Sequence, residues 1–208
     1  MRVIAGELRG RRLAAPDAAG VRPTGDRVRE AMFDVLFSLG GVEGRRVLDL
    51  FAGSGALGIE ALSRGAASAT FVDRSAEVVA AVRRNLASVG LGGAESDGVA
   101  TVVRATAESW IAGSAARFDI AFCDPPYDYE GWGALLAALP ADLAVLESRR
   151  PVEVTDGWGV VRSRRYGGTL VTVIRAEPAT TGAGAREPLP GAVPAVSGRA
   201  GHVHGGEP

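Results

Sequence analysis

The sequence predicts an α/β fold with a mostly parallel, seven-stranded sheet. Three observations support this prediction. Near-continuous apolar segments alternate with helical patterns from residue 46 onward, as they do when helices cover both faces of a parallel sheet. The last two apolar segments are close enough in sequence to form an antiparallel hairpin at one edge of the sheet. The 208 residues, 47% of them hydrophobic, suffice for one domain with a core.

The N-terminal segment predicts a small β-hairpin followed by a helix. Residues 2–5 and 11–15 have the pattern of two short strands, with two glycines in the turn between them. Thr24 is a suitable N-cap for the helix, because its hydroxyl can accept a bond from a free backbone N–H group. Apolar side chains then recur at helical spacing as far as the glycine pair at 40–41, where we expect the helix to end.

Strands and helices alternate from there to residue 174. The predicted strands are residues 47–51, 69–73, 99–104, 118–123, 144–147, 160–164 and 169–174. The predicted helices are residues 56–64, 76–89, 107–112 and 135–139. Strands that alternate with helices predict parallel pairing, whereas the short connection before the last strand predicts the hairpin.

Composition divides the chain into three parts. They are a basic N-terminal hairpin at residues 1–22, an α/β domain at residues 23–175 and a C-terminal tail at residues 176–208. The tail holds seven glycines, five prolines and no aromatic residue, which predicts disorder. Both histidines, His202 and His204, lie in this tail. A domain without histidine argues against His-based nucleophilic triads and most zinc sites, so we expect no metal.

The net charge of −1 does not by itself suggest a nucleic-acid partner. Basic residues are nevertheless concentrated near the N-terminus, where residues 1–29 hold seven arginines against three acidic residues. Because arginine makes planar, bidentate contacts with phosphate, we expect this segment to bind nucleic acid. A solvated basic hairpin is the alternative. The candidate residues are Arg9, Arg11, Arg12, Arg22, Arg27 and Arg29.

The sequence also predicts the cellular location of the protein. No apolar stretch approaches the length of a membrane span, and the first residues lack the apolar core of a signal peptide. The single cysteine, Cys123, lies inside a predicted strand, so there is no disulfide framework. We therefore expect a cytoplasmic protein that is not attached to a membrane.

The most informative segment is Asp124-Pro125-Pro126-Tyr127, which follows the apolar residues 118–123. The two prolines fix φ and remove two backbone donors where the strand ends. A carboxylate and a backbone carbonyl there can accept hydrogen bonds from an amino group on a flat ring, and the tyrosine can stack on that ring. This chemistry is typical of methylating a nucleobase amine, which makes Asp124, Pro125 and Tyr127 the candidate catalytic residues. A purely structural, Pro-rich turn is the alternative.

A glycine-rich loop follows the first strand of the alternating region. Gly53 and Gly55 allow the backbone to pass close to a ligand, and the start of the next helix supplies amide donors. Polar residues also follow neighbouring strands, and the carboxyl ends of parallel strands border one crevice. The candidate cofactor-binding residues are Asp49, Ala52, Gly53, Ser54, Gly55, Asp73, Arg74, Thr106 and Ala107.

The loop is also compatible with a different cofactor. Gly53, Gly55 and Gly58 match the dinucleotide fingerprint, with Asp73 twenty residues on to bind a ribose. A nicotinamide-dependent oxidoreductase is therefore an alternative. Asp49 argues against it, because a carboxylate there would repel a pyrophosphate but attract the ammonium or sulfonium of S-adenosylmethionine. The histidine-free domain also offers no obvious proton-transfer residue.

Residues 2–175 resemble the RsmD family of ribosomal RNA methyltransferases. The motifs that carry the resemblance are Arg2-Val3-Ile4-Ala5-Gly6, Arg9-Gly10-Arg11, Arg22-Pro23-Thr24, Arg27-Val28-Arg29-Glu30, residues 48–58, residues 60–66 and Asp124-Pro125-Pro126-Tyr127. The resemblance implies the Rossmann-like fold of S-adenosylmethionine-dependent methyltransferases. It also implies methyl transfer to the 2-amino group of a guanine in bacterial 16S rRNA, with residues 1–22 as an rRNA-binding extension.

The resemblance further implies roles for individual residues. Asp49, Gly53, Ser54 and Gly55 would hold the methionine part of the cofactor, Asp73 the ribose, and Thr106 and Ala107 the adenine. We expect a monomer whose partner is 16S rRNA in the small ribosomal subunit. DNA adenine and cytosine amino-methyltransferases share the Asp-Pro-Pro-Tyr corner and are an alternative, as is an RNA-binding module without activity.

Overall fold

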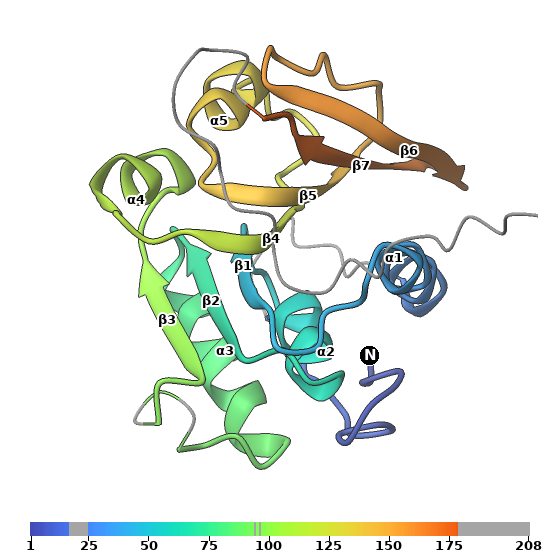
Figure 1. Ribbon diagram of the computed structural model, residues 1–208. Helices are drawn as coiled ribbons and strands as arrows, with labels where there is room; N and C mark the ends of the chain where they lie inside the picture. Colours follow the sequence, from blue (N-terminus) through green and yellow to red (C-terminus); the bar gives the residue numbers. More distant parts are fainter. Residues whose placement is uncertain (17–24, 94, 96, 179–208) are drawn as a thin grey trace, which may run out of the picture. The chain divides into compact units, whose positions relative to one another are not determined.

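The computed structural model of the chain describes residues 1–16, 25–93, 95 and 97–178. Seven strands form one sheet in the order β3-β2-β1-β4-β5-β7-β6 (Figure 1). The strands are β1 Arg46–Leu50, β2 Ser68–Asp73, β3 Ala100–Arg104, β4 Phe118–Cys123, β5 Ala141–Ser148, β6 Trp158–Tyr166 and β7 Thr169–Ala176. The helices are α1 Asp26–Ser38, α2 Ala56–Ser63, α3 Ala76–Ser88, α4 Ala107–Gly113 and α5 Trp132–Ala138.

Strand directions agree with the sequence prediction. The strands β3, β2, β1, β4 and β5 are mutually parallel, and β7 pairs antiparallel with both β5 and β6. The predicted α/β class, the mostly parallel seven-stranded sheet and the C-terminal antiparallel hairpin are therefore confirmed. No helix in the described part of the chain is long and apolar enough to span a membrane.

Helices cover both faces of the parallel part of the sheet. Successive side chains of a strand point to opposite faces. Val47 accordingly joins the core cluster that contains side chains of α1, α2 and α3, whereas Leu48 joins the cluster with α4 and α5. Phe122 and Cys123 at the end of β4 alternate in the same way. Both faces thus need apolar side chains, which explains the near-continuous apolar segments in the sequence.

The strand register defines two ends of the sheet. We call the end at which β1 to β5 terminate the carboxyl end, and the opposite one the amino end. Because β7 runs antiparallel to β5, and β6 antiparallel to β7, the last residues of β6 also lie at the carboxyl end. Arg165 is paired with Leu170, which is paired with Ser148 at the end of β5.

The first sixteen residues, which we call the N-terminal arm, form the predicted small hairpin, with a short antiparallel pairing. Its two halves are joined by a bridge between Arg2 and Arg12 and by flanking backbone hydrogen bonds, among them Val3 N–H to the Arg11 carbonyl at 2.9 Å. The hairpin is also bound to α2, where the Glu60 carboxylate accepts the backbone N–H of Ile4 at 2.8 Å and that of the next residue at 3.0 Å. These hydrogen bonds fix the arm to α2.

The first helix begins later than predicted. Gly25 is the N-cap residue, without a side-chain cap, and its carbonyl accepts the N–H groups of the first turn. Thr24 is therefore not the N-cap. Thr24 and Arg22 lie outside the described residues, as do residues 179–208 with both histidines. The division of the chain into three parts remains a prediction.

Candidate active site

The carboxyl end of the sheet gathers the predicted site residues. Asp49 lies near the end of β1, Asp73 ends β2 and Asp124 directly follows β4, and these three strands are neighbours in the sheet. Thr106 follows β3, which pairs with β2. Four polar positions from four adjacent strands therefore share one end of the sheet with the glycine loop (Figure 1).

Glycines determine the shape of the loop after β1. Gly53 and Gly55 have φ angles of 55° and 74°, the left-handed region that glycine adopts without strain. At Gly58, a Cβ atom would lie 2.3 Å from the ring of Phe71, so that only glycine lets α2 pack this closely on β2. The Gly58 N–H group donates to Asp49 Oδ2 at 2.9 Å. The loop and the first strand are thereby joined.

Asp49 places a buried carboxyl group at this end of the sheet. Only 2% of the residue is exposed. Burial raises its pKa from 3.8 to about 7, against the opposing effect of the Gly58 hydrogen bond and with a further contribution from the charge of Asp73. A desolvated carboxylate beside a second carboxylate favours a cationic ligand and disfavours a phosphate.

Two other predicted cofactor residues hold local structure. Asp73 accepts the N–H of Ser75 at 2.9 Å and that of Gly53 at 3.4 Å, which connects the glycine loop to the start of α3. Thr106 is the N-cap of α4, where its hydroxyl accepts the N–H of Ser109 at 3.2 Å. Ala107 is buried in the core, whereas Arg74 after β2 is exposed.

The Asp-Pro-Pro-Tyr corner is accessible at its tyrosine. Tyr127 is 43% exposed, while Pro125 is buried. The guanidinium carbon of Arg149 lies 3.9 Å from the centre of the Tyr127 ring, so a cation from the end of β5 covers one face of the predicted stacking residue. Sequence reasoning did not identify Arg149, because the two residues are far apart in the chain.

Aromatic residues that the sequence analysis did not single out lie beside the corner. Phe51 has a φ of 62°, an unusual angle for a residue other than glycine, and its ring contacts Tyr129 with centroids 5.2 Å apart. Tyr129 in turn contacts Trp132 and donates to Glu108 Oε1 at 2.7 Å. That hydrogen bond lowers the pKa of Glu108. Strained backbone at a ligand site is common, and Phe51 stands between Asp49 and the glycine loop.

Arg29, a predicted RNA contact, does not reach the surface. Its side chain is fully buried, and its guanidinium binds Asp26 Oδ1 at 3.0 Å and the backbone carbonyl of Arg2. Its Nε also lies 3.7 Å from Glu60 Oε2, an ion-pair contact beyond hydrogen-bonding distance. The prediction for Arg29 is wrong, because this arginine satisfies buried acceptors and holds the N-terminal arm on α1 and α2.

The other predicted RNA-binding arginines are exposed but dispersed. Arg9, Arg12 and Arg27 are exposed, whereas Arg22 lies outside the residues that the structure describes. The exposed Arg11 donates to the carbonyl of Val89 at 2.8 Å, just past the end of α3. Since α3 runs antiparallel to the strands, that end lies at the amino end of the sheet. Arg9 and Arg11 are therefore distant from the Asp124 corner.

Asn85 joins the N-terminal arm to the glycine loop, and the sequence analysis did not single it out. The residue is 2% exposed on α3. Its side-chain oxygen accepts the N–H of Ala14 at 2.9 Å, and its amide donates to the carbonyls of Ala14 and Ser54 at 2.9 and 2.8 Å. Ser54 also contacts the sulfur of Met1 at 3.2 Å. The arm thus supports the loop that is predicted to hold the cofactor.

A large cavity lies elsewhere. It has a volume of about 760 Å³ and is lined by the arm turn around Glu7, the loop between α2 and β2, and Val99 before β3. These segments belong to the amino end of the sheet, and none of the predicted catalytic or cofactor residues lines the cavity. This cavity is therefore separate from the predicted site.

Comparison with known proteins agrees with the family resemblance that the sequence motifs indicate. The family model described as conserved hypothetical protein 95 matches residues 1–175. Ribosomal RNA small subunit methyltransferase D of Escherichia coli K12 is 43% identical over 127 residues, which are 61% of this chain and 60% of that protein. The YlbH protein of Bacillus subtilis is 37% identical over 188 residues, covering 84% of this chain and 98% of that protein.

A solved structure matches as well. The yhhF protein of Escherichia coli superposes with a TM-score of 0.72 at 35% identity, over 85% of this chain and 98% of that one. The match to the curated Escherichia coli relative spans only about 60% of that protein's length. These comparisons confirm the resemblance inferred from the motifs and the Rossmann-like methyltransferase fold.

Proposed function

The chain belongs to the conserved hypothetical protein 95 family, and we propose that it methylates the exocyclic 2-amino group of a guanine in 16S rRNA of the small ribosomal subunit. The observation that carries the proposal is the convergence of Asp49, Asp73 and Asp124 with the glycine loop at one end of the sheet. The name of the Escherichia coli relative supports rRNA as the substrate class.

The proposed methyl donor is S-adenosylmethionine, which supplies an electrophilic methyl group on a sulfonium. The charge at the site fits this ligand, because Asp73 and the ionised form of Asp49 create a negative potential that favours a cation. Gly53, Ser54 and Gly55 would hold its methionine part, Asp73 its ribose, and the start of α4 with Thr106 and Ala107 its adenine. The same negative potential disfavours a dinucleotide pyrophosphate and thus the oxidoreductase alternative.

In the proposed mechanism the chain activates the amine by positioning it. A guanine 2-amino group is a poor nucleophile, because its lone pair is delocalised into the ring. Asp124 and the Pro125 carbonyl would accept its two N–H bonds and orient the lone pair toward the methyl group. The base must be splayed out of its stack, and Tyr127 would then cover it, while Arg149 supports the tyrosine.

Methyl transfer to purified small subunits tests this proposal. We expect labelled methyl groups to enter 16S rRNA with wild-type protein and transfer to fall at least a hundredfold in Asp124→Ala, with cofactor affinity unchanged. Asp128→Ala is the matched control, because this exposed carboxylate lies in the same loop. Near-normal transfer by Asp124→Ala would contradict the role of the corner. Transfer to DNA instead of subunits would favour the DNA-enzyme alternative.

A further inference from the structure

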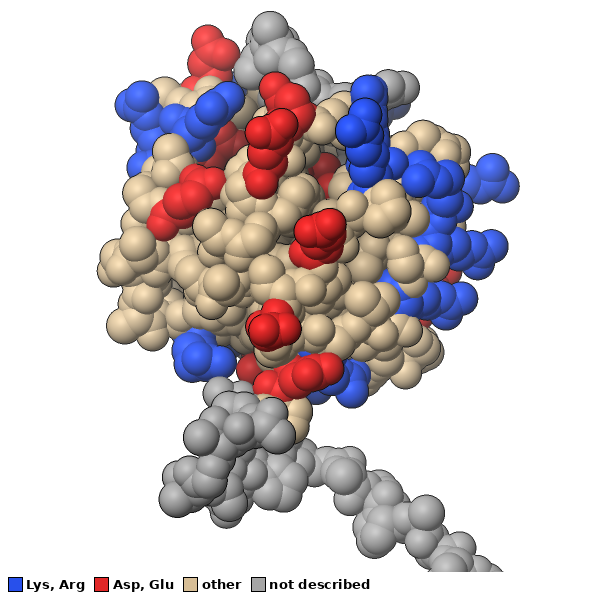
Figure 2. Space-filling view, turned by 90° about the horizontal axis from the view of Figure 1, so that it is seen from above, with Lys and Arg blue, Asp and Glu red and all other residues tan. Residues whose placement is uncertain are grey.

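The C-terminal hairpin presents arginines that the proposed function has not used. β6 is an edge strand that is exposed on both faces over most of its length. Arg162, Arg164 and Arg165 lie on β6, and Arg149 and Arg150 directly follow β5. All five are exposed, and we call them the hairpin arginines. Basic side chains gather along one side of the face seen in Figure 2.

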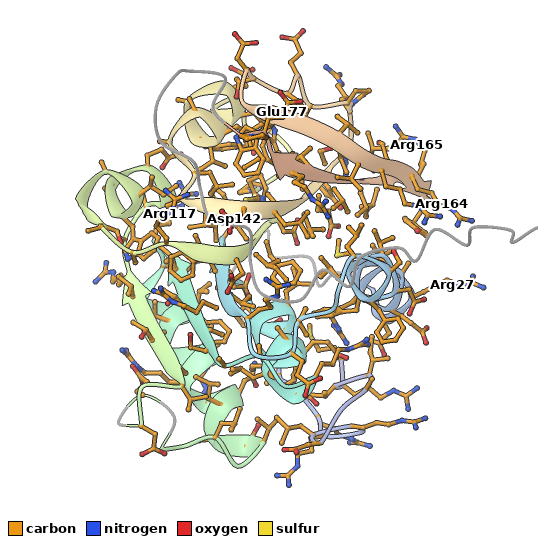
Figure 3. All side chains as sticks on the ribbon, in the orientation of Figure 1. Arg27, Arg117, Asp142, Arg164, Arg165 and Glu177 are labelled. Atoms are coloured by element: carbon orange, nitrogen blue, oxygen red, sulfur yellow. The ribbon has the colours of Figure 1, made fainter. Side chains whose placement is uncertain are left out.

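The register brings the hairpin arginines to the same end of the sheet as Asp124. Arg165 is paired through Leu170 to Ser148, the last residue of β5, and β5 is parallel to β4. Figure 3 shows Arg164 and Arg165 projecting from the end of β6, on the same side of the molecule as Arg27 of α1. Arg117, by contrast, lies on the opposite side in this view.

Direct contacts connect these arginines to the corner. Both terminal nitrogens of Arg165 donate to the carbonyl of Arg149 at 3.2 Å. The side chain of Arg149 lies on the ring of Tyr127, at 3.9 Å from its centre. A continuous path of contacts therefore leads from β6 to the residue that would stack on the target base.

The arginines on β6 have no acidic neighbour within their own hairpin. The segment from Trp158 to Ala176 contains no acidic residue. None of the five arginines forms an ion pair with an acidic residue in the described part of the chain. A groove of about 190 Å³ between α1 and β6 is lined by Arg162 and Arg164 with one carboxylate, Asp34, which is not paired with them.

We propose that the hairpin arginines are the main phosphate-binding surface for the rRNA segment that flanks the target base. This inference rests on the proposed function, since it names the part of the molecule that holds the same substrate. Unpaired arginines bind phosphate bidentately and release counterions on binding. Because Arg149 lies on Tyr127 and Arg165 binds the Arg149 carbonyl, this surface could hold the backbone of the strand from which the base is splayed out. The alternative explanation is that the charges on β6 serve to prevent this exposed edge strand from pairing with another chain.

Salt-dependent binding to purified small subunits distinguishes these explanations. The test variant is R162Q/R164Q/R165Q, and the control R84Q/R117Q/R175Q removes the same charge from exposed positions. We expect the test variant to bind about tenfold or more weakly near physiological salt. The slope of log K against log salt should fall in magnitude by about two to three, roughly one for each lost contact.

Two further measurements keep this inference separate from the proposed function. S-adenosylmethionine affinity and thermal unfolding should be unchanged in the test variant. The inference is overturned if the test variant keeps the wild-type salt slope, or if the control variant loses as much affinity for subunits as the test variant does. The proposed function stands in either case, provided that the wild-type protein methylates subunits. If the wild type binds subunits through the hairpin but transfers no methyl group, the proposed function fails and the binding surface stands.

Discussion

The N-terminal arm and the C-terminal hairpin are both rich in arginine, yet the structure uses the two groups differently. Arg29 beside the arm is buried against Asp26 and Glu60, and Arg11 of the arm binds a backbone carbonyl. The hairpin arginines have no acidic partner in the described residues and lie at the carboxyl end of the sheet. Arginine density in a sequence therefore does not identify an RNA surface, because the acceptors that surround each guanidinium decide its role.

Removing Glu60 should have the largest effect on stability. Glu60→Ala would remove one of the two carboxylates beside the buried Arg29 guanidinium and free the N–H groups of Ile4 and Ala5. We expect the free energy of unfolding to fall by about 3–5 kcal/mol. The control is Glu7→Ala, an exposed acidic residue of the arm. Equal chemical denaturation curves for the two variants would contradict a structural role for this ion pair.

Asp49, on the central strand β1, should control how the stability of the protein depends on pH. Its raised pKa means that the folded protein retains a proton that the unfolded chain releases above 3.8. Stability should therefore fall as pH rises from about 4 to about 7, by at most about 4 kcal/mol. Asp49→Asn should remove this pH dependence and raise the unfolding free energy at pH 8.

Cofactor binding provides the second half of that test. The ionised form of Asp49 attracts a cation, so affinity for S-adenosylmethionine should rise as pH increases through about 7. The Asp49→Asn variant should bind weakly at every pH, as measured by titration calorimetry. A wild-type affinity that does not change between pH 6 and pH 8 would exclude Asp49 as the group that attracts the cation.

Asn85 should connect the arm to cofactor binding. Asn85→Ala would leave the backbone groups of Ala14 and the carbonyl of Ser54 without this partner. We expect a loss of about 1–3 kcal/mol in stability and a weaker affinity for S-adenosylmethionine. The exposed neighbour Arg84→Ala is the control. Unchanged cofactor affinity in Asn85→Ala would show that the arm and the loop are independent.

The smallest stability effect is expected in the hairpin. Because R162Q/R164Q/R165Q removes exposed side chains without ion pairs, its unfolding free energy should stay within about 0.5 kcal/mol of wild type. Arg9→Gln combined with Arg12→Gln provides the corresponding test of the arm, and it should weaken subunit binding less than the hairpin variant does. Deleting the arm is unsuitable, since Val3 and Leu13 belong to the core.

The sheet was predictable from the sequence because its determinants are local. Apolar runs such as residues 118–123 mark strands that are covered on both faces, and glycines mark the loop after β1. The burial of Arg29 was not predictable in this way, because its neighbour Glu60 is distant in sequence. For the same reason the sequence predicted the hairpin of the arm but not its attachment to α2, where Glu60 accepts two of its backbone N–H groups.

The site was predictable only in part. Strand ends predicted the convergence of Asp49, Asp73 and Asp124, because parallel strands expose their carboxyl ends together. The contact of Arg149 with Tyr127 depends on the pairing of β4 with β5, and the position of Arg165 depends on two antiparallel registers. Such long-range pairings leave no local pattern in the chain.

We propose that the carboxyl end of this sheet transfers a methyl group to a guanine amine of rRNA. Nucleoside mass spectrometry of 16S rRNA, after small subunits react with wild-type protein and S-adenosylmethionine, tests it most directly. We expect one methyl group on the 2-amino nitrogen of a guanosine, and none when the Asp124→Ala variant is used. Methylation of a ring nitrogen, of a ribose or of adenosine would contradict it, as would the same product from the Asp124→Ala variant.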